Sequence, residues 1–165
     1  MRLRRLAIAL VLPLAFTACL EGTDYSTNST PAIPIEQTTF ASGLNVDLTA
    51  STKTTSGLYI RDITVGTGNA ATTGSTVSVY YAGYLSSGQL FDSRSSPSNP
   101  FAVVLGTNSV IKGWEEGLIG MKVGGARQLI IPPSLAYGPS GYNTIPPNAV
   151  LVFNVQLVGL QGPTQ

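Results

Sequence analysis

The stretch VIKGWEEGLIG, residues 110–120, holds the only tryptophan of the chain and its only two adjacent glutamates. Two carboxylates can act as general acid and general base when both face one reacting bond. Successive residues of a helix point about 100° apart, however, so Glu115 and Glu116 cannot serve one bond together. Both would lie in a first helical turn, where carboxylates interact favourably with the helix dipole. The pattern therefore predicts two solvated glutamates at the start of a helix and Trp114 directed inward as the floor of a cavity.

The chain contains no histidine. This absence excludes Ser-His-Asp and Cys-His catalysis, a histidine general base, and zinc sites that use imidazole. We expect neither a metal nor a cofactor.

The segment GTGNAA, which starts at Gly66, formally fits the dinucleotide-binding pattern G-x-G-x-x-A. That pattern requires a helix to open after the second glycine. The residues that follow, TTGSTVSV, are β-branched and typical of turns and strands. We interpret the segment as a turn.

Asp92 follows Phe91 at the end of a strand-like run, in LFDSRSS. It is either an Asx turn that closes the strand or a carboxylate at the rim of an apolar pocket. Large aromatic side chains recur on successive elements and suit either a core or a ligand pocket lined by rings. They are Tyr81, Phe91, Phe101, Trp114, Tyr137 and Phe153.

Only 10% of the residues are charged, and the chain has 18 glycines and 11 prolines, which favours a β-rich fold with many turns. From residue 57 onward, strand patterns cover residues 57–65, 75–85, 89–94, 101–106, 124–132 and 149–160. Ser86, Ser87 and Gly88 predict a tight hairpin turn. Helical character is confined to residues 113–120. We expect an α+β domain in which an antiparallel sheet curls around one short α-helix.

The N-terminus is typical of an export signal, with MRLRR followed by the apolar run LAIALVLPLAFTA, which ends at Ala18. We assign residues 1–18 to a signal peptide. The motif FTAC resembles the bacterial lipobox, in which the cysteine is acylated, here Cys19. The alternative is ordinary secretion with a free thiol. The residue after the cysteine is Leu20 and not Asp, which resembles the Gram-negative lipoproteins that are sorted to the outer membrane. We therefore expect an exported protein that is lipid-anchored to a bacterial membrane, the outer membrane, and faces the periplasm.

Residues 19–55 are rich in Ser and Thr and predict a flexible, lipidated tether. FASGLNVDL is an exception, because Leu44, Val46 and Leu48 alternate with other residues and could form a strand or arm docked on the domain. Nine Lys/Arg less three in the signal peptide leaves six, against eight Asp/Glu, a net charge of −2. This balance gives no reason to expect a nucleic acid partner.

Three segments strongly resemble the FKBP-type peptidyl-prolyl cis-trans isomerases: VYYAGYLSSGQLFDSR, PFAVVLGTNSVIKGWEEGLIGMKVGGARQLIIPPSLAYG and IPPNAVLVFNVQLVGL. The resemblance covers about residues 56–160 and places an isomerase domain at residues 56–165. It implies an antiparallel sheet around a short helix, with an apolar pocket between them.

Carried over by position, the resemblance implies a catalytic set of Tyr81, Asp92, Trp114 and Tyr137. The implied substrate-binding residues are Phe91, Phe101, Val110, Ile111, Ile145 and Phe153. The Ile111 N–H and the Tyr137 hydroxyl resemble the donors that meet substrate carbonyls. Many family members pair the aspartate with an arginine a few residues later, but Arg94 comes too early for that position. Tyr142 stands where a histidine is frequent, in a loop one residue shorter than in many members.

The resemblance implies rotation of Xaa-Pro bonds in unfolded or nascent exported polypeptides, and binding of macrolides such as rapamycin. The alternative is an FKBP-fold binding or chaperone module with weak isomerase activity. The sequence has no long helical dimerisation segment, so we expect a monomer.

Overall fold

The computed structural model describes residues 31–163. The predicted signal peptide, Cys19 and the first part of the predicted tether lie outside this range. The described chain forms one antiparallel sheet with the order β1-β2-β6-β7-β3-β4, in which β5 pairs with the first half of β3. The strands are β1 (Thr52–Lys53), β2 (Tyr59–Thr64), β3 (Thr76–Leu85), β4 (Leu90–Arg94), β5 (Phe101–Val104), β6 (Ala126–Ile131) and β7 (Leu151–Gln161).

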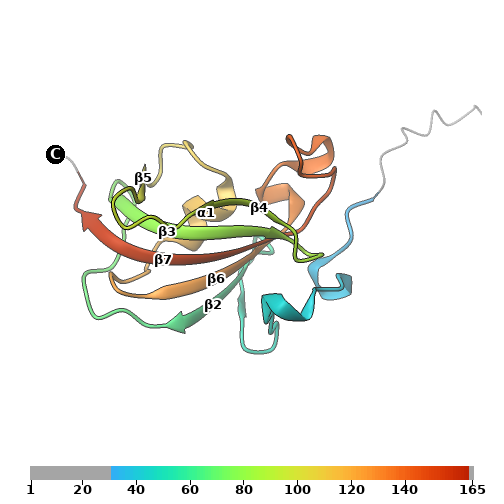
Figure 1. Cartoon of the computed structure of the whole chain (residues 1–165), viewed down its shortest axis with the longest axis horizontal. Coiled ribbons are helices and arrows are strands. Elements are labelled where there is room, and N and C mark those ends of the chain that lie inside the picture. Colours follow the sequence, from blue (N-terminus) through green and yellow to red (C-terminus); the bar gives the residue numbers. More distant parts are fainter. Residues whose placement is uncertain (1–30, 164–165) are drawn as a thin grey trace, which may run out of the picture.

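The expected α+β fold is confirmed, because this sheet curls around one short helix, α1 (Lys112–Gly117). Figure 1 shows α1 on one side of the sheet, behind β3 and β4. The bounds of the expected strands lie within two residues of the observed bounds, and β1 was not expected. Residues 66–69 form no helix, which agrees with the interpretation of GTGNAA as a turn. Gly88 has a φ of 89° in the tight turn between β3 and β4.

The helix α1 packs directly on β6 through two glycines. A Cβ atom on Gly113 would lie 2.4 Å from Ile131 Cγ2, and one on Gly117 would lie 2.7 Å from Leu129 Cδ2. Six residues are too few for a helix that is stable alone in water. Tertiary contact with β6 therefore holds α1 in place, and it requires glycine at both positions.

The other face of the sheet is covered by an arm, residues 34–48, which contains the 3-10 helices η1 (Ile35–Gln37) and η2 (Ser42–Leu44). Ile35 and Leu44 are buried against the outward side chains of β2, β6 and β7. Gln128 Nε2 donates to the Leu44 carbonyl at 2.9 Å. Figure 1 shows η2 on the side of the sheet opposite α1. Apolar residues are consequently buried on both faces of the sheet.

This part of the chain departs from the expected tether. The composition of residues 31–55 predicts flexibility, yet a few apolar side chains suffice to dock the arm because an apolar row of the sheet lies beneath them. The docked alternative for residues 40–48 holds, but as a 3-10 helix. Asn45 adopts a left-handed conformation with a φ of 48°, which ends η2 and prevents a continuous strand.

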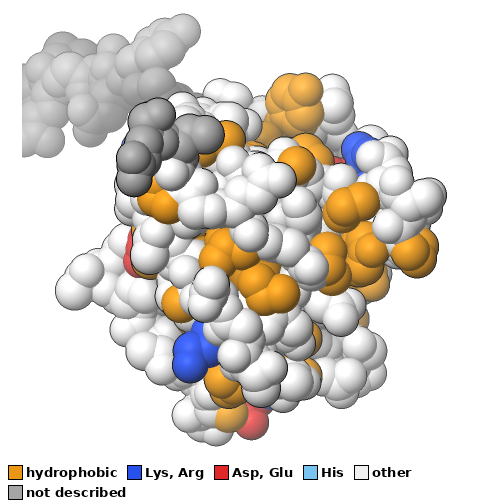
Figure 2. All heavy atoms as spheres, turned by 90° about the vertical axis from the view of Figure 1, so that its left-hand side faces the viewer, with side chains coloured by type: hydrophobic (Ala, Val, Ile, Leu, Met, Phe, Trp, Pro, Cys, Tyr) orange, Lys and Arg blue, Asp and Glu red, His pale blue; other side chains and the backbone are white. Residues whose placement is uncertain are grey.

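The surface agrees with a composition in which only 10% of residues are charged. On the face that Figure 2 shows, hydrophobic side chains form small separate patches, and charged side chains are few and isolated. Within residues 31–163, no helix is long and apolar enough to cross a membrane.

Replacing Gly117 with alanine should lower the free energy of unfolding by about 1–3 kcal/mol, because the new methyl group would overlap Leu129. Chemical denaturation measures the loss. Gly43→Ala is the matched control, because a Cβ atom at Gly43 meets nothing within 4 Å. Equal stability of the two variants would contradict the close contact between α1 and β6.

The carboxyl of Glu36, in the arm, should make the stability of the fold depend on pH. Hydrogen bonds from Lys53 and then Tyr59 lower the pKa of Glu36 from 4.5 to about 2. A carboxyl with a depressed pKa stabilises the fold above its unfolded pKa, and this contribution is lost as the pH falls. The melting temperature should therefore fall between about pH 4.5 and pH 2 through this group, and less steeply in Glu36→Gln. Parallel pH profiles of the two proteins would rule out this contribution.

Candidate functional site

Trp114 is the centre of a cluster of aromatic rings between α1 and the sheet. Its side chain is only 3% exposed. The ring centroids of Tyr81, Phe101 and Phe153 lie 5.0, 6.0 and 5.3 Å from that of Trp114, all in edge-to-face geometry. Edge-to-face pairs contribute about 0.5–1.5 kcal/mol each beyond their buried area. The cluster therefore forms a rigid apolar wall, with Trp114 buried and directed inward as the sequence predicts.

A cavity of about 180 Å³ opens beside this cluster. It is lined by Tyr81, Asp92, Phe101, Ser109, Val110, Ile111, Trp114, Tyr137 and Phe153. Eight of the ten site residues expected from the sequence line this one cavity. Ser109 is the only lining residue that the sequence did not single out, and a serine in the run GTNSV carries no signal that separates it from an ordinary turn residue.

A second cavity of about 310 Å³ adjoins the first. Asp92 and Tyr137 line both cavities. The two remaining expected residues, Phe91 and Ile145, line the second cavity. Its other lining residues belong to one loop: Tyr142, Asn143 and Thr144. The structure thus separates the expected residues into a central cavity and a neighbouring one.

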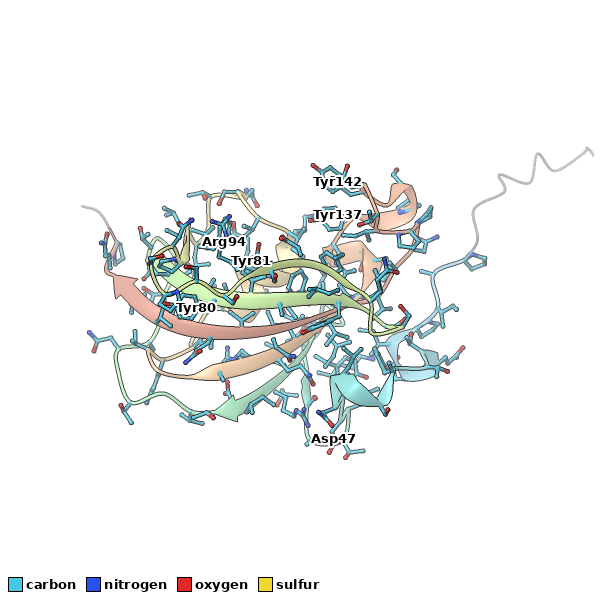
Figure 3. The ribbon with its side chains drawn as sticks, viewed as in Figure 1. Asp47, Tyr80, Tyr81, Arg94, Tyr137 and Tyr142 are labelled. Atoms are coloured by element: carbon cyan, nitrogen blue, oxygen red, sulfur yellow. The ribbon has the colours of Figure 1, made fainter. Side chains whose placement is uncertain are left out.

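The hairpin of β3 and β4 positions two polar groups of the central cavity, the Tyr81 hydroxyl and the Asp92 carboxylate. Strand alternation places Tyr80 on the outer face of the sheet and Tyr81 on the face of α1, as Figure 3 shows. The Tyr81 hydroxyl donates to Asp92 Oδ2 at 2.7 Å. Asp92 therefore lies at the rim of the pocket, bonded to Tyr81. Gly83 lets the rings of Phe91 and Phe153 meet beneath β3, since its Cβ would lie within 2.8 Å of both.

Burial and then the hydrogen bond to Asp92 raise the pKa of Tyr81 well above its usual value of 10.0. Its hydroxyl therefore stays protonated and remains a donor at physiological pH. Among residues 31–163, no Lys or Arg nitrogen lies within 4.0 Å of the Asp92 carboxylate. Arg94, two residues along β4, does not form this ion pair.

Trp114 Nε1 is a buried donor of the central cavity and has no hydrogen-bond partner within the described residues. Two further donors there also lack one: the backbone N–H of Ile111, at the start of α1, and the hydroxyl of Tyr137. Burial, followed by the charge of Asp92, raises the pKa of Tyr137, so this hydroxyl also stays protonated. Both donors are free to meet the carbonyl groups of an extended polypeptide.

The two glutamates of α1 differ from the expectation in one respect. Glu115 accepts a hydrogen bond from the Gly106 N–H, whereas Glu116 accepts one from the Ser56 hydroxyl. They do point apart, so they form no acid/base pair. The expectation that both are solvated was wrong, because each is half-buried against a different loop. Only Glu115 lies in the first turn of α1, so the expectation that both glutamates lie there was also wrong.

Arg127 is a positioning residue that the sequence did not reveal. Only 8% of it is exposed. Its guanidinium donates to both Asp62 oxygens at 2.7 and 3.1 Å, and to the carbonyls of Gly117 and Ile119 at 2.8 and 3.1 Å. It thus binds the end of the helix that carries Trp114. The only signal is an arginine in β6, a strand whose other residues are apolar except Gln128, directly across from Asp62 in β2.

A larger hollow, of about 500 Å³, is an open trough on the outer face beside the arm. Its polar groups already bond to one another: Arg61 donates to Gln128 and to the Asn45 carbonyl, and Gln128 donates to Asn154. One donor there, the buried Arg61 Nε, has no partner, but only two aromatic residues, Tyr80 and Tyr81, line the trough. The smaller cavity beside Trp114, with its cluster of rings, is therefore the stronger candidate. Within the described part of the chain, no three His, Cys, Asp or Glu side chains are placed to hold a metal ion.

Comparison with known proteins gives a consistent result. The sequence model of the FKBP-type peptidyl-prolyl cis-trans isomerases matches residues 67–158. The chain is 45% identical over 103 residues to the "FK506-binding protein" of Neisseria meningitidis serogroup B, covering 62% of this chain and 94% of that protein. It is 45% identical over 113 residues to "FK506-binding protein 4" of Neurospora crassa, covering 68% of this chain and 24% of that protein.

Among solved structures, FkpA from Escherichia coli superposes with a TM-score of 0.64 and 38% sequence identity. The match covers 70% of this chain and 53% of that one. The chain spans about a quarter of the length of several curated relatives that it matches.

Proposed function

The chain belongs to the FKBP-type peptidyl-prolyl cis-trans isomerase family, and on this premise we propose that it catalyses rotation about Xaa-Pro bonds in polypeptides. One observation carries the proposal. An apolar cavity walled by Trp114 and three further rings also holds two free donors, the Ile111 N–H and the Tyr137 hydroxyl. A proline ring fits an apolar cavity, and its flanking carbonyls require donors.

The energy that the site must supply is modest. Rotation about an Xaa-Pro bond meets a barrier of about 20 kcal/mol and takes roughly 10–100 s unaided. A turnover on the order of 10³ s⁻¹ requires four to five decades of acceleration, or about 6–7 kcal/mol. No covalent step is needed, which suits a chain without histidine.

The cavity favours the twisted bond over the planar one. A planar amide is stabilised by resonance and is strongly dipolar, so water favours it, whereas the twisted transition state is less dipolar. The rings around Trp114 replace water with an apolar wall and so stabilise the twisted form. The Ile111 N–H holds the chain after the proline, which fixes the geometry of the rotation.

Asp92 acts in this scheme through Tyr81 and through its own charge. Its Oδ2 atom accepts from the Tyr81 hydroxyl at 2.7 Å and so fixes the ring that contacts Trp114. The same carboxylate lies at the rim of the cavity, where it interacts with the carbonyl carbon of the rotating bond.

A second candidate function is that of an FKBP-fold binding or chaperone module with weak isomerase activity. The observation that favours it is the absence of a cation beside Asp92 within the described residues. Suppression of aggregation of a client that lacks proline, together with slow isomerisation, would favour this alternative.

We further propose a setting for this activity. The sequence pattern of residues 1–19 supports export and anchoring to a bacterial membrane through acylated Cys19, at the outer membrane and facing the periplasm. The clients would then be proline-containing unfolded or nascent exported polypeptides, and a macrolide such as rapamycin would compete for the same cavity. The protein would act as a monomer.

Single substitutions in the cavity should lower kcat/KM for isomerisation of a short Xaa-Pro peptide by different factors, according to the contact that each removes. Trp114→Ala removes an apolar contact worth about 1.5–3 kcal/mol, so kcat/KM should fall roughly ten- to hundredfold. Trp114→Phe, which keeps an apolar ring, should retain most activity. Asp92→Asn weakens the hydrogen bond from Tyr81 by about 1 kcal/mol and should lower kcat/KM several-fold.

Tyr80→Phe is the matched control, because Tyr80 lies on the outer face of β3 and its hydroxyl donates to the Pro97 carbonyl. It should retain full activity. Equal rates for Trp114→Ala, Asp92→Asn and the unaltered protein would show that this cavity does not catalyse the reaction.

Lipid attachment has its own test in a bacterial host supplied with labelled palmitate. The label should enter the protein and be lost in Cys19→Ser, since this residue is the only cysteine of the chain. The serine variant should also leave the membrane fraction. Unlabelled protein of the unaltered sequence would point instead to ordinary secretion.

A further inference from the structure

Asp92 is an exposed carboxylate at the junction of two cavities, and it has no cationic partner among residues 31–163. Tyr81 donates to only one of its two oxygens, Oδ2. The carboxylate is therefore free to pair with a cation that a bound polypeptide supplies.

The second cavity places an aromatic surface beside that carboxylate. The rings of Tyr137 and Tyr142 stack with a centroid distance of 5.2 Å and an interplanar angle of 12°. Although Tyr142 stacks on Tyr137 on one side, 58% of it is exposed. Figure 3 shows the two rings one above the other at the end of the molecule that carries the loop after β6. A large ring fixed in this way presents a flat face to whatever enters the cavity.

The lining of the second cavity determines which side chain fits. Asp92 is its only charged residue, Asn143 and Thr144 are its neutral polar residues, and the rest are apolar or aromatic. Cations are attracted to aromatic faces, and arginine also stacks on them. An anionic side chain would face Asp92 with no cation to offset the repulsion.

The other charges near the site do not reverse this preference. The charge of Arg94 lowers the pKa of Tyr81 by less than burial and the hydrogen bond to Asp92 raise it. Arg94 lines neither cavity, and Figure 3 shows it well separated from Tyr142. Glu115 accepts a hydrogen bond from the Gly106 N–H and also lines neither cavity.

We propose that the second cavity binds the side chain of an arginine or lysine that immediately precedes the proline, with Tyr142 as the stacking surface and Asp92 as the counter-ion. This inference rests on the proposed isomerase function. The rotating carbonyl belongs to the preceding residue and lies beside Asp92 and Tyr137, which line both cavities. The chain after the proline is held by Ile111, which lines only the central cavity.

The test compares kcat/KM for peptides Ala-Xaa-Pro-Phe in a protease-free isomerisation assay of the purified protein. Arginine and citrulline at Xaa have nearly the same shape and differ in charge. The arginine peptide should be turned over about three- to tenfold more efficiently at low salt, the range of a partly exposed cation–π contact plus an ion pair. This ratio should shrink at high salt because the charges are screened. A glutamate peptide should be a poorer substrate than its glutamine counterpart.

Three variants assign the preference to the cavity. The ratio of arginine to citrulline should fall towards one in Tyr142→Ala and in Asp92→Asn, and should persist in Tyr142→Phe, which keeps the ring. A ratio is insensitive to a general loss of activity, so it remains informative even where Asp92→Asn slows every peptide.

Equal kcat/KM for the arginine and citrulline peptides in the unaltered protein would overturn the inference and leave the isomerase function intact. A preference for arginine that survives both Tyr142→Ala and Asp92→Asn would overturn it as well, because the cation would then bind elsewhere. No acceleration of any peptide would overturn the proposed function and this inference together.

Discussion

The helix that carries Trp114 has six residues and depends on its contact with β6. Gly113 and Gly117 allow the two backbones to approach until Ile131 and Leu129 fill the space that a Cβ would occupy. Arg127 reaches from the same strand to the carbonyls of Gly117, the last residue of the helix, and of Ile119 just beyond it. These contacts fix the position of the indole, and the rings of β3, β5 and β7 pack around it edge to face. These contacts hold the helix against the sheet and so keep the indole wall of the apolar cavity in place.

The outer face of the sheet supports the site from the other side. The arm buries Ile35 and Leu44 over β6 and β7, whose inner side chains belong to the aromatic core. Its backbone also reaches the hairpin that carries Tyr81 and Asp92, since the Ala41 N–H donates to the Ser86 carbonyl at 2.9 Å. A segment that resembles a linker by composition is therefore a third layer of the domain.

The positions of the strands and of the helix were predictable from the sequence because they depend on local periodicity. Alternation and, for β5, a short apolar run located all strands except β1, which has two residues. The glycine-flanked segment of Trp114 located the helix. The identities of the site residues came from the family resemblance, and eight of the ten line one cavity. Pairings between distant residues were not predictable. The bond from Gly106 to Glu115, the bonds of Arg127 to Asp62 and to the end of α1, and the docking of the arm depend on which loops and strands meet in space. The stacking of Tyr142 on Tyr137 depends in the same way on the path of a short loop.

The most direct test of the central claim follows binding and rotation in one sample by nuclear magnetic resonance. The chain has one tryptophan, so the indole N–H of Trp114 gives a single signal that reports on the cavity. A proline peptide at equilibrium should show exchange between its cis and trans signals when the protein is added, and the indole signal should shift with the same dependence on peptide concentration. Exchange without a shift of the indole signal, or a shift without exchange, would contradict the account that the cavity beside Trp114 both binds proline and rotates its bond.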